Sequence, residues 1–142
     1  MLHGIPNIIS PELLKILMEM GHGDEIVIGD GNFPAASHAQ RLVRCDGHQV
    51  PELLDAILHL FPLDQYVEKP VSLMQVVPGD KSETPIWDTF ETIIRERTGK
   101  SDTFEQVERF EFYKRARNAY AIIATSESAL YANIILKKGV IA

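Results

Sequence analysis

A short apolar run, Ile26-Val27-Ile28, lies between two glycine-rich turns, Gly21–Asp24 and Gly29–Pro34. β-Branched residues in a short run with turn signals on both sides are typical of a strand buried in a sheet. Glycine lets the chain turn tightly at each end, because it has no β-carbon to restrict the backbone. The stretch therefore predicts a buried strand over Glu25–Gly29 with a tight loop at each end.

Each of these loops also carries polar groups suited to proton chemistry. His22 and Asp24 precede the strand, and Asp30 and Asn32 follow it. Loops beside buried strands commonly hold the reactive groups of α/β proteins. Glycine, aspartate and asparagine also favour ordinary surface turns. Turn composition alone therefore leaves open that both loops are surface turns without a chemical role.

Helical and strand-like segments alternate along most of the chain. Prolines placed just inside helix starts, apolar faces at helical spacing and terminal glycines mark the helices. Helices are expected from Pro11 to Met20 with Gly21 ending the first one, from Pro51 until Pro62, from Pro85 until Gly99, and over Arg109–Asn118; strands are expected over Glu25–Gly29, Arg41–Cys45, Val71–Val77, Tyr120–Thr125 and Asn133–Leu136. This alternation predicts one α/β domain over residues 1–142, with a central sheet covered by helices.

Charge and cysteine content narrow the possible partners and the compartment. The net charge of −6 argues against nucleic acid or an anionic membrane as a partner, because both attract basic surfaces. No apolar run approaches the roughly 20 residues of a membrane span, and the N-terminal residues lack the pattern of a signal peptide. The single cysteine, Cys45, allows no internal disulfide and fits a reducing compartment. A cytoplasmic protein is expected.

Several familiar cofactor and metal patterns are absent from the sequence. Gly29-Asp30-Gly31 is followed by Asn32-Phe33-Pro34 instead of a dinucleotide-binding pattern, and there is no phosphate-binding loop, nucleophile elbow or Cys-x-x-Cys pair. The five histidines show no paired metal-ligand spacing within one helix. We expect no cofactor and no metal.

His22 and Asp30 are the strongest candidates for a reactive site. Histidine gives and takes protons near neutral pH, and a carboxylate accepts hydrogen bonds from hydroxyl groups such as those of a sugar. Eight residues separate them, which is up to roughly 26 Å when extended, whereas a hydrogen bond reaches about 3 Å. Either the Gly21–Asp24 turn folds back sharply, or a neighbouring subunit completes the site. The second arrangement is favoured.

Longer motifs along the chain resemble those of a known protein family. They are Met20-Gly21-His22-Gly23-Asp24, Asp30 with Phe33-Pro34, Arg44-Cys45-Asp46-Gly47, Glu108-Arg109-Phe110-Glu111-Phe112-Tyr113 and the segment from Tyr131 to Val140. Together they resemble the L-fucose mutarotase and ribose pyranase family over nearly the whole chain, least between Lys81 and Val107. Arg109 followed by an aromatic residue resembles the fucose branch of this family more than the ribose branch.

The resemblance implies a site and an assembly. It implies His22 as the proton donor and sugar-binding roles for Asp30, Arg109, Tyr131, Ala132 and Asn133. It also implies a ring-forming homo-oligomer, a decamer, with sites near subunit interfaces. The apolar residues Ile134–Leu136 and Val140-Ile141 are a further hint of self-association.

The implied activity is interconversion of the α and β anomers of L-fucose through the open-chain aldehyde, an isomerase reaction of carbohydrate metabolism. Ring opening needs a proton delivered to the ring oxygen and one removed from the anomeric hydroxyl, which general acid–base catalysis supplies. Two alternatives stay open: interconversion of pyranose and furanose forms of ribose or fucose, and a sugar-binding accessory protein without catalysis. A purely structural protein is the least favoured, because it has no need of His22 or Asp30.

Overall fold

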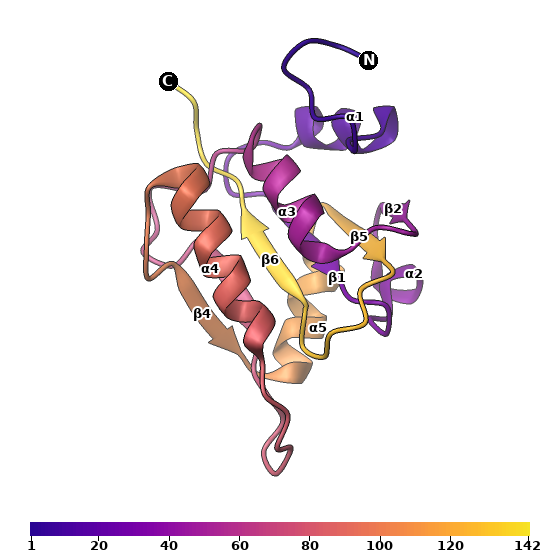
Figure 1. Cartoon of the computed structure of the whole chain (residues 1–142), viewed down its shortest axis with the longest axis vertical. Coiled ribbons are helices and arrows are strands. Elements are labelled where there is room, and N and C mark those ends of the chain that lie inside the picture. The colour runs from indigo at the N-terminus through magenta and orange to yellow at the C-terminus, as the bar shows by residue number, and fades with distance from the viewer.

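The computed structural model describes residues 1–142 as a six-stranded mixed sheet with helices on both faces (Figure 1). The strands lie in the order β2-β5-β1-β6-β3-β4. The elements are α1 (Pro11–Glu19), β1 (Glu25–Gly29), α2 (Ala35–His38), β2 (Leu42–Cys45), α3 (Val50–Leu58), β3 (Val71–Met74), α4 (Pro85–Thr98), β4 (Phe104–Val107), α5 (Arg109–Asn118), β5 (Ala121–Thr125) and β6 (Ile134–Lys137). The predicted α/β fold with a central sheet covered by helices is confirmed.

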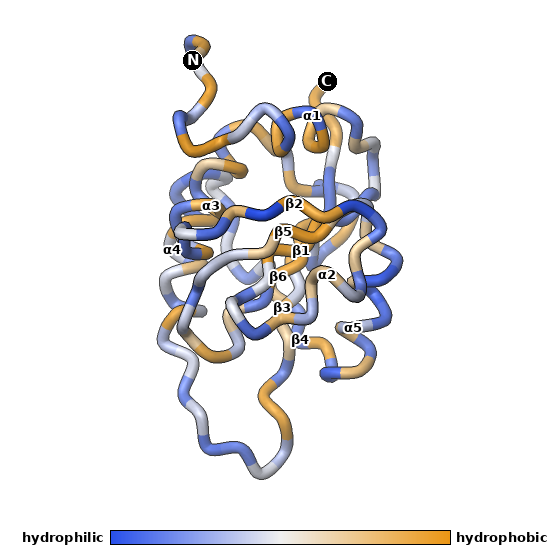
Figure 2. The backbone as a smooth tube through the Cα atoms, turned by 90° about the vertical axis from the view of Figure 1, so that its right-hand side faces the viewer, coloured by the Kyte–Doolittle hydropathy of each residue, from blue (hydrophilic) through white to orange (hydrophobic).

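Alternating side chains of the strands form two cores, one on each face of the sheet. Ile26 and Ile28 belong to the larger core, which α1, α3 and α4 cover, whereas Val27 belongs to the smaller core under α2 and α5. Figure 2 shows the hydrophobic central strands between α3 and α4 on one side and α2 and α5 on the other. Successive residues of a strand point to opposite faces, so a strand with both faces buried is apolar throughout.

The strand directions bring several chain segments to one edge of the sheet. β1 runs parallel to β5 and antiparallel to β6, and β6 is antiparallel to β3, which is parallel to β4. The carboxyl ends of β1, β3 and β4 therefore lie at the same edge as the beginning of β6. In open α/β sheets, ligands bind outside the carboxyl ends of the strands.

Several elements differ from the expectation, among them α3, which ends at Leu58 instead of just before Pro62. β3 ends at Met74 instead of Val77, because β6 begins at Ile134, opposite Leu73, and offers no antiparallel partner further on. β4 and α2 were not predicted: β4 is a polar edge strand and α2 is a single turn. α1 ends at Glu19, and its cap Met20 is extended, so no left-handed glycine terminates this helix.

The C-terminal apolar run serves the core. Ile134, Ile135 and Leu136 are fully buried in β6, between β1 and β3, so they offer no surface to a second copy. Only Ile141 of that hinted surface is largely exposed, at 77%. The longest helix has 14 residues, and none of the helices has the length and apolar character for a membrane span.

Candidate functional site

A pocket of about 240 Å³ opens at the carboxyl edge of β1, β3 and β4. Four of the predicted site residues line it: Asp30, Arg109, Tyr131 and Asn133. The other lining residues are Asn32, Phe33, Met74, Val77, Asp80, Tyr113 and Leu130. The pocket thus combines a carboxylate, a guanidinium, phenols and amides with apolar side chains, which suits a small polar ligand.

Asp30 is the buried anion of this pocket. Its residue is 7% exposed, directly after β1. Its backbone N–H donates to Asn133 Oδ1 over 2.8 Å, and its Oδ1 accepts from the Asn32 backbone N–H over 3.0 Å. Burial raises the pKa of Asp30, although hydrogen bonds from the backbones of Asn32, Ala132 and Phe33 and from the Asn133 side chain oppose the rise. A carboxyl group with a raised pKa is suited to proton transfer.

The glycines around Asp30 are required by space. A β-carbon on Gly29 would lie 2.8 Å from the β-carbon of Phe33, and one on Gly31 would lie 3.0 Å from the Glu127 carbonyl oxygen. Neither glycine has a positive φ, so close approach rather than an unusual backbone explains both. The tight turn holds Asp30 in the lining of the pocket.

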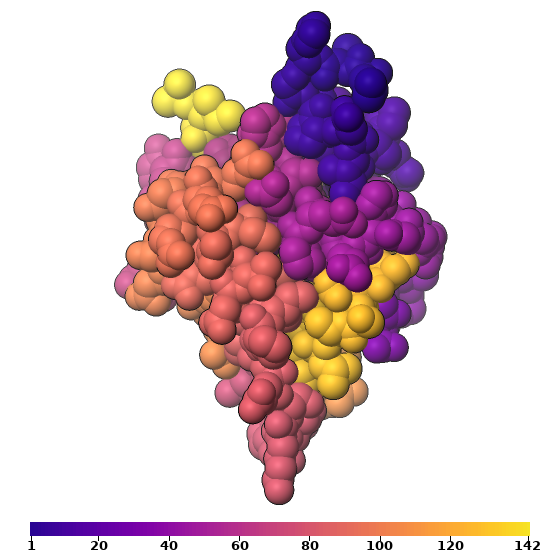
Figure 3. All heavy atoms as spheres, viewed as in Figure 1, coloured from indigo at the N-terminus to yellow at the C-terminus, as the bar shows by residue number.

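Tyr131 connects the pocket to the loop of residues 75–84, between β3 and α4. Its hydroxyl donates to Asp80 Oδ2 over 2.5 Å and accepts from the Val77 backbone N–H over 3.2 Å. Its carbonyl accepts from Trp87 Nε1 over 2.8 Å. The loop forms the narrow tip of the molecule (Figure 1, Figure 3). Tyr131 has a φ of 56°, a left-handed conformation that is uncommon for a residue other than glycine and is often kept at functional sites.

Arg109 and Ala132 are the remaining predicted sugar-binding residues. Arg109, at the start of α5, lies over the rings of Phe110 and Tyr113 at 5.1 and 5.7 Å from the guanidinium carbon and forms no ion pair within the chain. Its planar group is free to donate to ligand oxygens. Ala132 does not line the pocket, and its side chain is fully buried.

His22 lies at the opposite edge of the sheet. It precedes β1 while Asp30 follows β1, and that strand alone spans about 13 Å. The Gly21–Asp24 turn does not fold back towards the pocket, because the Gly23 backbone N–H donates to the Lys138 carbonyl beyond the far end of β6. His22 Nε2 instead contacts Asp64 Oδ1 at 3.0 Å. Within one chain, the predicted proton donor is separate from the predicted sugar-binding residues.

Several residues of the pocket, and the partner of His22, were not predicted from the sequence. Asp80 and Val77 belong to a loop with no chemical motif. Tyr113 ends the motif Glu108–Tyr113 but was given no role there; it lies one turn after Arg109 on α5. Asp64 follows a proline-terminated helical segment, and nothing near it in sequence indicates His22 as its neighbour.

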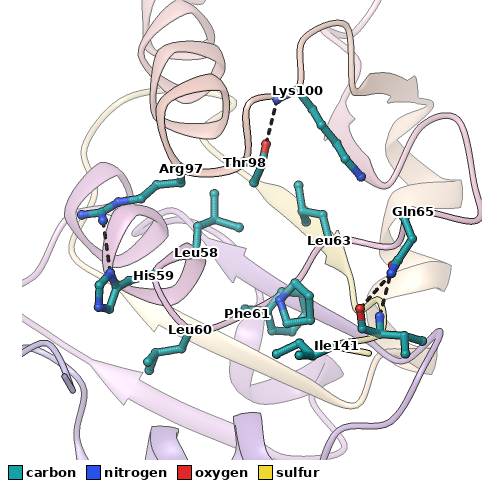
Figure 4. Close-up of a pocket in the computed structure, with 12 residues that line it drawn as sticks. Leu58, His59, Leu60, Phe61, Leu63, Gln65, Arg97, Thr98, Lys100 and Ile141 are labelled. Carbon is teal, nitrogen blue, oxygen red and sulfur yellow. Dashed lines mark hydrogen bonds between the residues drawn. The ribbon is translucent and has the colours of Figure 1, made fainter.

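A second pocket, of about 330 Å³, lies between the end of α3, the end of α4 and the C-terminal segment (Figure 4). None of the predicted site residues lines it. Its guanidinium, on Arg97, already makes two hydrogen bonds to Asp55, of 2.7 and 3.0 Å, so it is neutralised within the chain. Nowhere in the structure do three or more His, Cys, Asp or Glu side chains gather as metal ligands.

The chain matches known proteins over its whole length. The model of the RbsD / FucU transport protein family matches residues 3–141. Human fucose mutarotase is 52% identical over 147 residues, covering 99% of this chain and 95% of the human protein. L-fucose mutarotase of Glaesserella parasuis is 51% identical over 140 residues, covering 99% of this chain and 96% of that protein.

Solved structures agree with the sequence matches. The crystal structure of the fucose mutarotase from Streptococcus pneumoniae in complex with L-fucose superposes with a TM-score of 0.95 at 54% identity, covering 99% of this chain and 100% of that one. The structure of Bacillus subtilis RbsD with D-ribose has a TM-score of 0.70 at 22% identity, covering 94% and 95%, and so shares the fold. The resemblance seen in the sequence motifs is confirmed: this chain belongs to the RbsD / FucU transport protein family.

Proposed function

We propose that this protein is an L-fucose mutarotase, an isomerase that interconverts the α and β anomers of the sugar. The observation that carries the proposal is the pocket in which Asp30, Arg109, Tyr131 and Asn133 meet, in a chain 54% identical to a fucose mutarotase solved with L-fucose. A monosaccharide presents several hydroxyl groups, and this pocket offers both acceptors and donors for them. Its apolar lining residues, Met74, Val77 and Leu130, suit the methyl group of a 6-deoxy sugar.

In this proposal, Asp30 binds hydroxyl groups and takes the proton of the anomeric hydroxyl as the ring opens. A general base works best when its pKa is near the working pH, and burial moves the pKa of Asp30 in that direction. Arg109 and Asn133 donate to sugar oxygens, Tyr131 bounds the pocket, and Ala132 contributes backbone groups. The open-chain aldehyde then rotates and closes on its other face, so the products differ only at the anomeric carbon.

The proton for the ring oxygen comes from His22 of a second copy. His22 is half-exposed, with 48% of its side chain accessible, at the edge of the sheet opposite the pocket of its own chain. A head-to-tail contact that brings this edge to the pocket of a neighbour forms a ring when the rotation between successive copies closes. We therefore propose a ring-forming homo-oligomer, a decamer, in which each site lies at a subunit interface.

We infer a cytoplasmic location from the cysteine chemistry. Cys45 is the only cysteine, is 8% exposed and makes no disulfide. Burial raises the pKa of its thiol, which keeps the sulfur protonated and unreactive, as suits a reducing compartment.

Saturation-transfer NMR on equilibrated sugars tests the proposal directly. We expect the protein to accelerate exchange between the anomers of L-fucose, and to act more slowly on L-galactose, whose hydroxyl replaces the methyl group. We expect the His22→Ala variant to fold normally and to lose roughly 10²- to 10⁴-fold in exchange rate, the usual contribution of general acid–base catalysis. Full exchange in this variant would remove His22 from the mechanism.

The same experiment separates the alternatives. Faster pyranose–furanose exchange of ribose than anomer exchange of L-fucose would indicate a pyranase. Binding of L-fucose in calorimetry with an unchanged exchange rate would indicate an accessory protein.

A further inference from the structure

His22 does not lie free at its edge of the sheet. Its Nε2 lies 3.0 Å from Oδ1 of Asp64, a carboxylate whose residue is only 3% exposed. Its ring also lies 5.2 Å from the ring of Tyr66, tilted by 50°. These contacts hold the imidazole at two sides.

The backbone places the two side chains opposite each other across the end of β6. On one side, the Gly23 N–H donates to the Lys138 carbonyl, and the Lys138 N–H donates to the Asp24 carbonyl. On the other side, the Asp64 N–H donates to the Lys137 carbonyl, and Leu63 pairs with Lys138. Both segments are thus attached to the same residues, 137–138, which sets the separation of His22 and Asp64.

Gly139 shows how closely the Asp64 segment is packed. A β-carbon at this position would lie 2.5 Å from the Leu63 carbonyl oxygen and 2.8 Å from the Cα of Asp64. The Gly139 N–H also donates to the Pro62 carbonyl over 2.7 Å. The Asp64 backbone therefore has little freedom to move away from His22.

Asp64 is ionised at neutral pH. Burial alone would raise the pKa of this carboxyl, but hydrogen bonds from the Tyr66 backbone N–H and from His22, together with the charges of His22 and Lys137, outweigh burial and leave the pKa below its ordinary value. Oδ1 accepts from both donors, at 3.0 Å each. A carboxylate without its own proton must accept from the imidazole, so Nε2 carries the hydrogen and Nδ1 is the nitrogen left unpaired.

We propose that Asp64 is the positioning residue of the reaction: it keeps the hydrogen on Nε2 of His22, so that Nδ1 is the nitrogen that takes up a proton from solvent and delivers it to the ring oxygen of the sugar. The proposal rests on the proposed mutarotase function. Asp64 itself has no route to the sugar, since it is buried behind the imidazole. The arrangement resembles other carboxylate–histidine pairs, in which the carboxylate fixes the tautomer and the ring orientation.

Two substitutions at Asp64 test this role. Asp64→Ala removes the acceptor, whereas Asp64→Asn retains an Oδ1 that can accept from both His22 and Tyr66. In long-range ¹H–¹⁵N spectra of the imidazole groups, assigned by difference from His22→Ala, we expect Nε2–H in the wild type and in Asp64→Asn, and mixed tautomers in Asp64→Ala. We expect kcat for L-fucose to fall roughly 10²-fold in Asp64→Ala through misplacement of the ring, with KM nearly unchanged, and Asp64→Asn to recover at least tenfold of that loss.

Asp55→Ala is the matched control, because it removes another ion-paired carboxylate, on α3 beside Arg97. It should leave the His22 tautomer and kcat unchanged. An Nδ1–H tautomer in the wild type overturns the proposal, even if Asp64→Ala fails to fold. An unchanged kcat in Asp64→Ala also overturns it. So does an equal loss of kcat in Asp64→Ala and Asp64→Asn with an unaltered His22 tautomer. Absence of L-fucose exchange in the wild type refutes the proposed function instead, and the spectra still decide the Asp64 contact.

Discussion

Asp30 shows how a single residue can serve the site at the expense of the fold. It lies in the lining of the pocket, 7% exposed, with a pKa raised mainly by burial. A raised pKa means that the folded state disfavours the ionised form relative to the unfolded chain. The stabilising contribution of Asp30 is therefore complete below the pKa of the unfolded chain, about 3.9, and is lost as the pH rises through the pKa of the folded state.

The direction of this pKa shift predicts how the Asp30→Asn substitution changes stability. We expect the variant to unfold at a higher temperature than the wild type at pH 7, with the difference vanishing towards pH 3, in calorimetric scans at several pH values. We also expect L-fucose exchange to fall by roughly 10²- to 10⁴-fold, because asparagine cannot take the proton of the anomeric hydroxyl as a general base.

Asp46→Asn is the control for the direction of the stability change. Arg44 lowers the pKa of Asp46, so this substitution should give no increase in unfolding temperature at pH 7. An Asp30→Asn variant that is less stable than the wild type at pH 7 would mean that the hydrogen bonds to the carboxylate outweigh its burial.

Among the elements, the loop of residues 75–84 depends on a neighbour far along the chain. Beyond Met74 the chain has lost its β6 partner, and Tyr131 holds the loop through Asp80 and the Val77 N–H. The loop is otherwise the protruding tip of the molecule (Figure 3). A loop tied by few contacts opens at a low free-energy cost.

Tyr131→Phe should release this loop. We expect faster amide hydrogen exchange over residues 75–84 and a KM for L-fucose raised about tenfold, which corresponds to the loss of one or two hydrogen bonds. Asp80→Asn is the matched variant, because it retains the Val77 contact and should have the smaller effect. Unchanged exchange in the loop of Tyr131→Phe would contradict this role.

The whole molecule places the two halves of the proposed site at opposite edges of one sheet. His22 and Asp30 flank β1, so no local rearrangement of the turns brings them together. In the proposed mechanism His22 therefore reaches the pocket from a second copy, and the half-exposed imidazole is available for that contact.

Mixing two inactive variants tests this shared site. His22→Ala retains an intact pocket, and Asp30→Asn retains an intact histidine. After dissociation and reassembly of an equal mixture, we expect about a quarter of the wild-type exchange rate, because half of the pockets and half of the histidines are intact. Each variant reassembled alone is the control, and light scattering gives the size of the assembly. A mixture no more active than the two variants separately would place both groups in one chain.

Local patterns in the sequence were sufficient to predict most of the fold, and the family resemblance supplied the candidate site residues. β1 and α5 have the predicted bounds, and Asp30, Arg109, Tyr131 and Asn133 line one pocket as the family resemblance implied. Periodic burial and cap residues report on neighbours within a few positions, which is why these elements were predictable. The polar edge strand β4 and the single turn α2 lack that signal.

Only the tertiary structure showed which candidate residues lie together and which lie apart. The antiparallel insertion of β6 between β1 and β3 brings Asn133 to Asp30, 103 residues earlier, and the far end of the same strand brings Asp64 to His22, 42 residues apart. Such contacts depend on strand order and direction, which no short-range pattern encodes. The sequence by itself therefore indicated which side chains are candidates for proton transfer and sugar binding, while the sheet topology determined that His22 lies at one edge of the sheet and the pocket residues lie at the other.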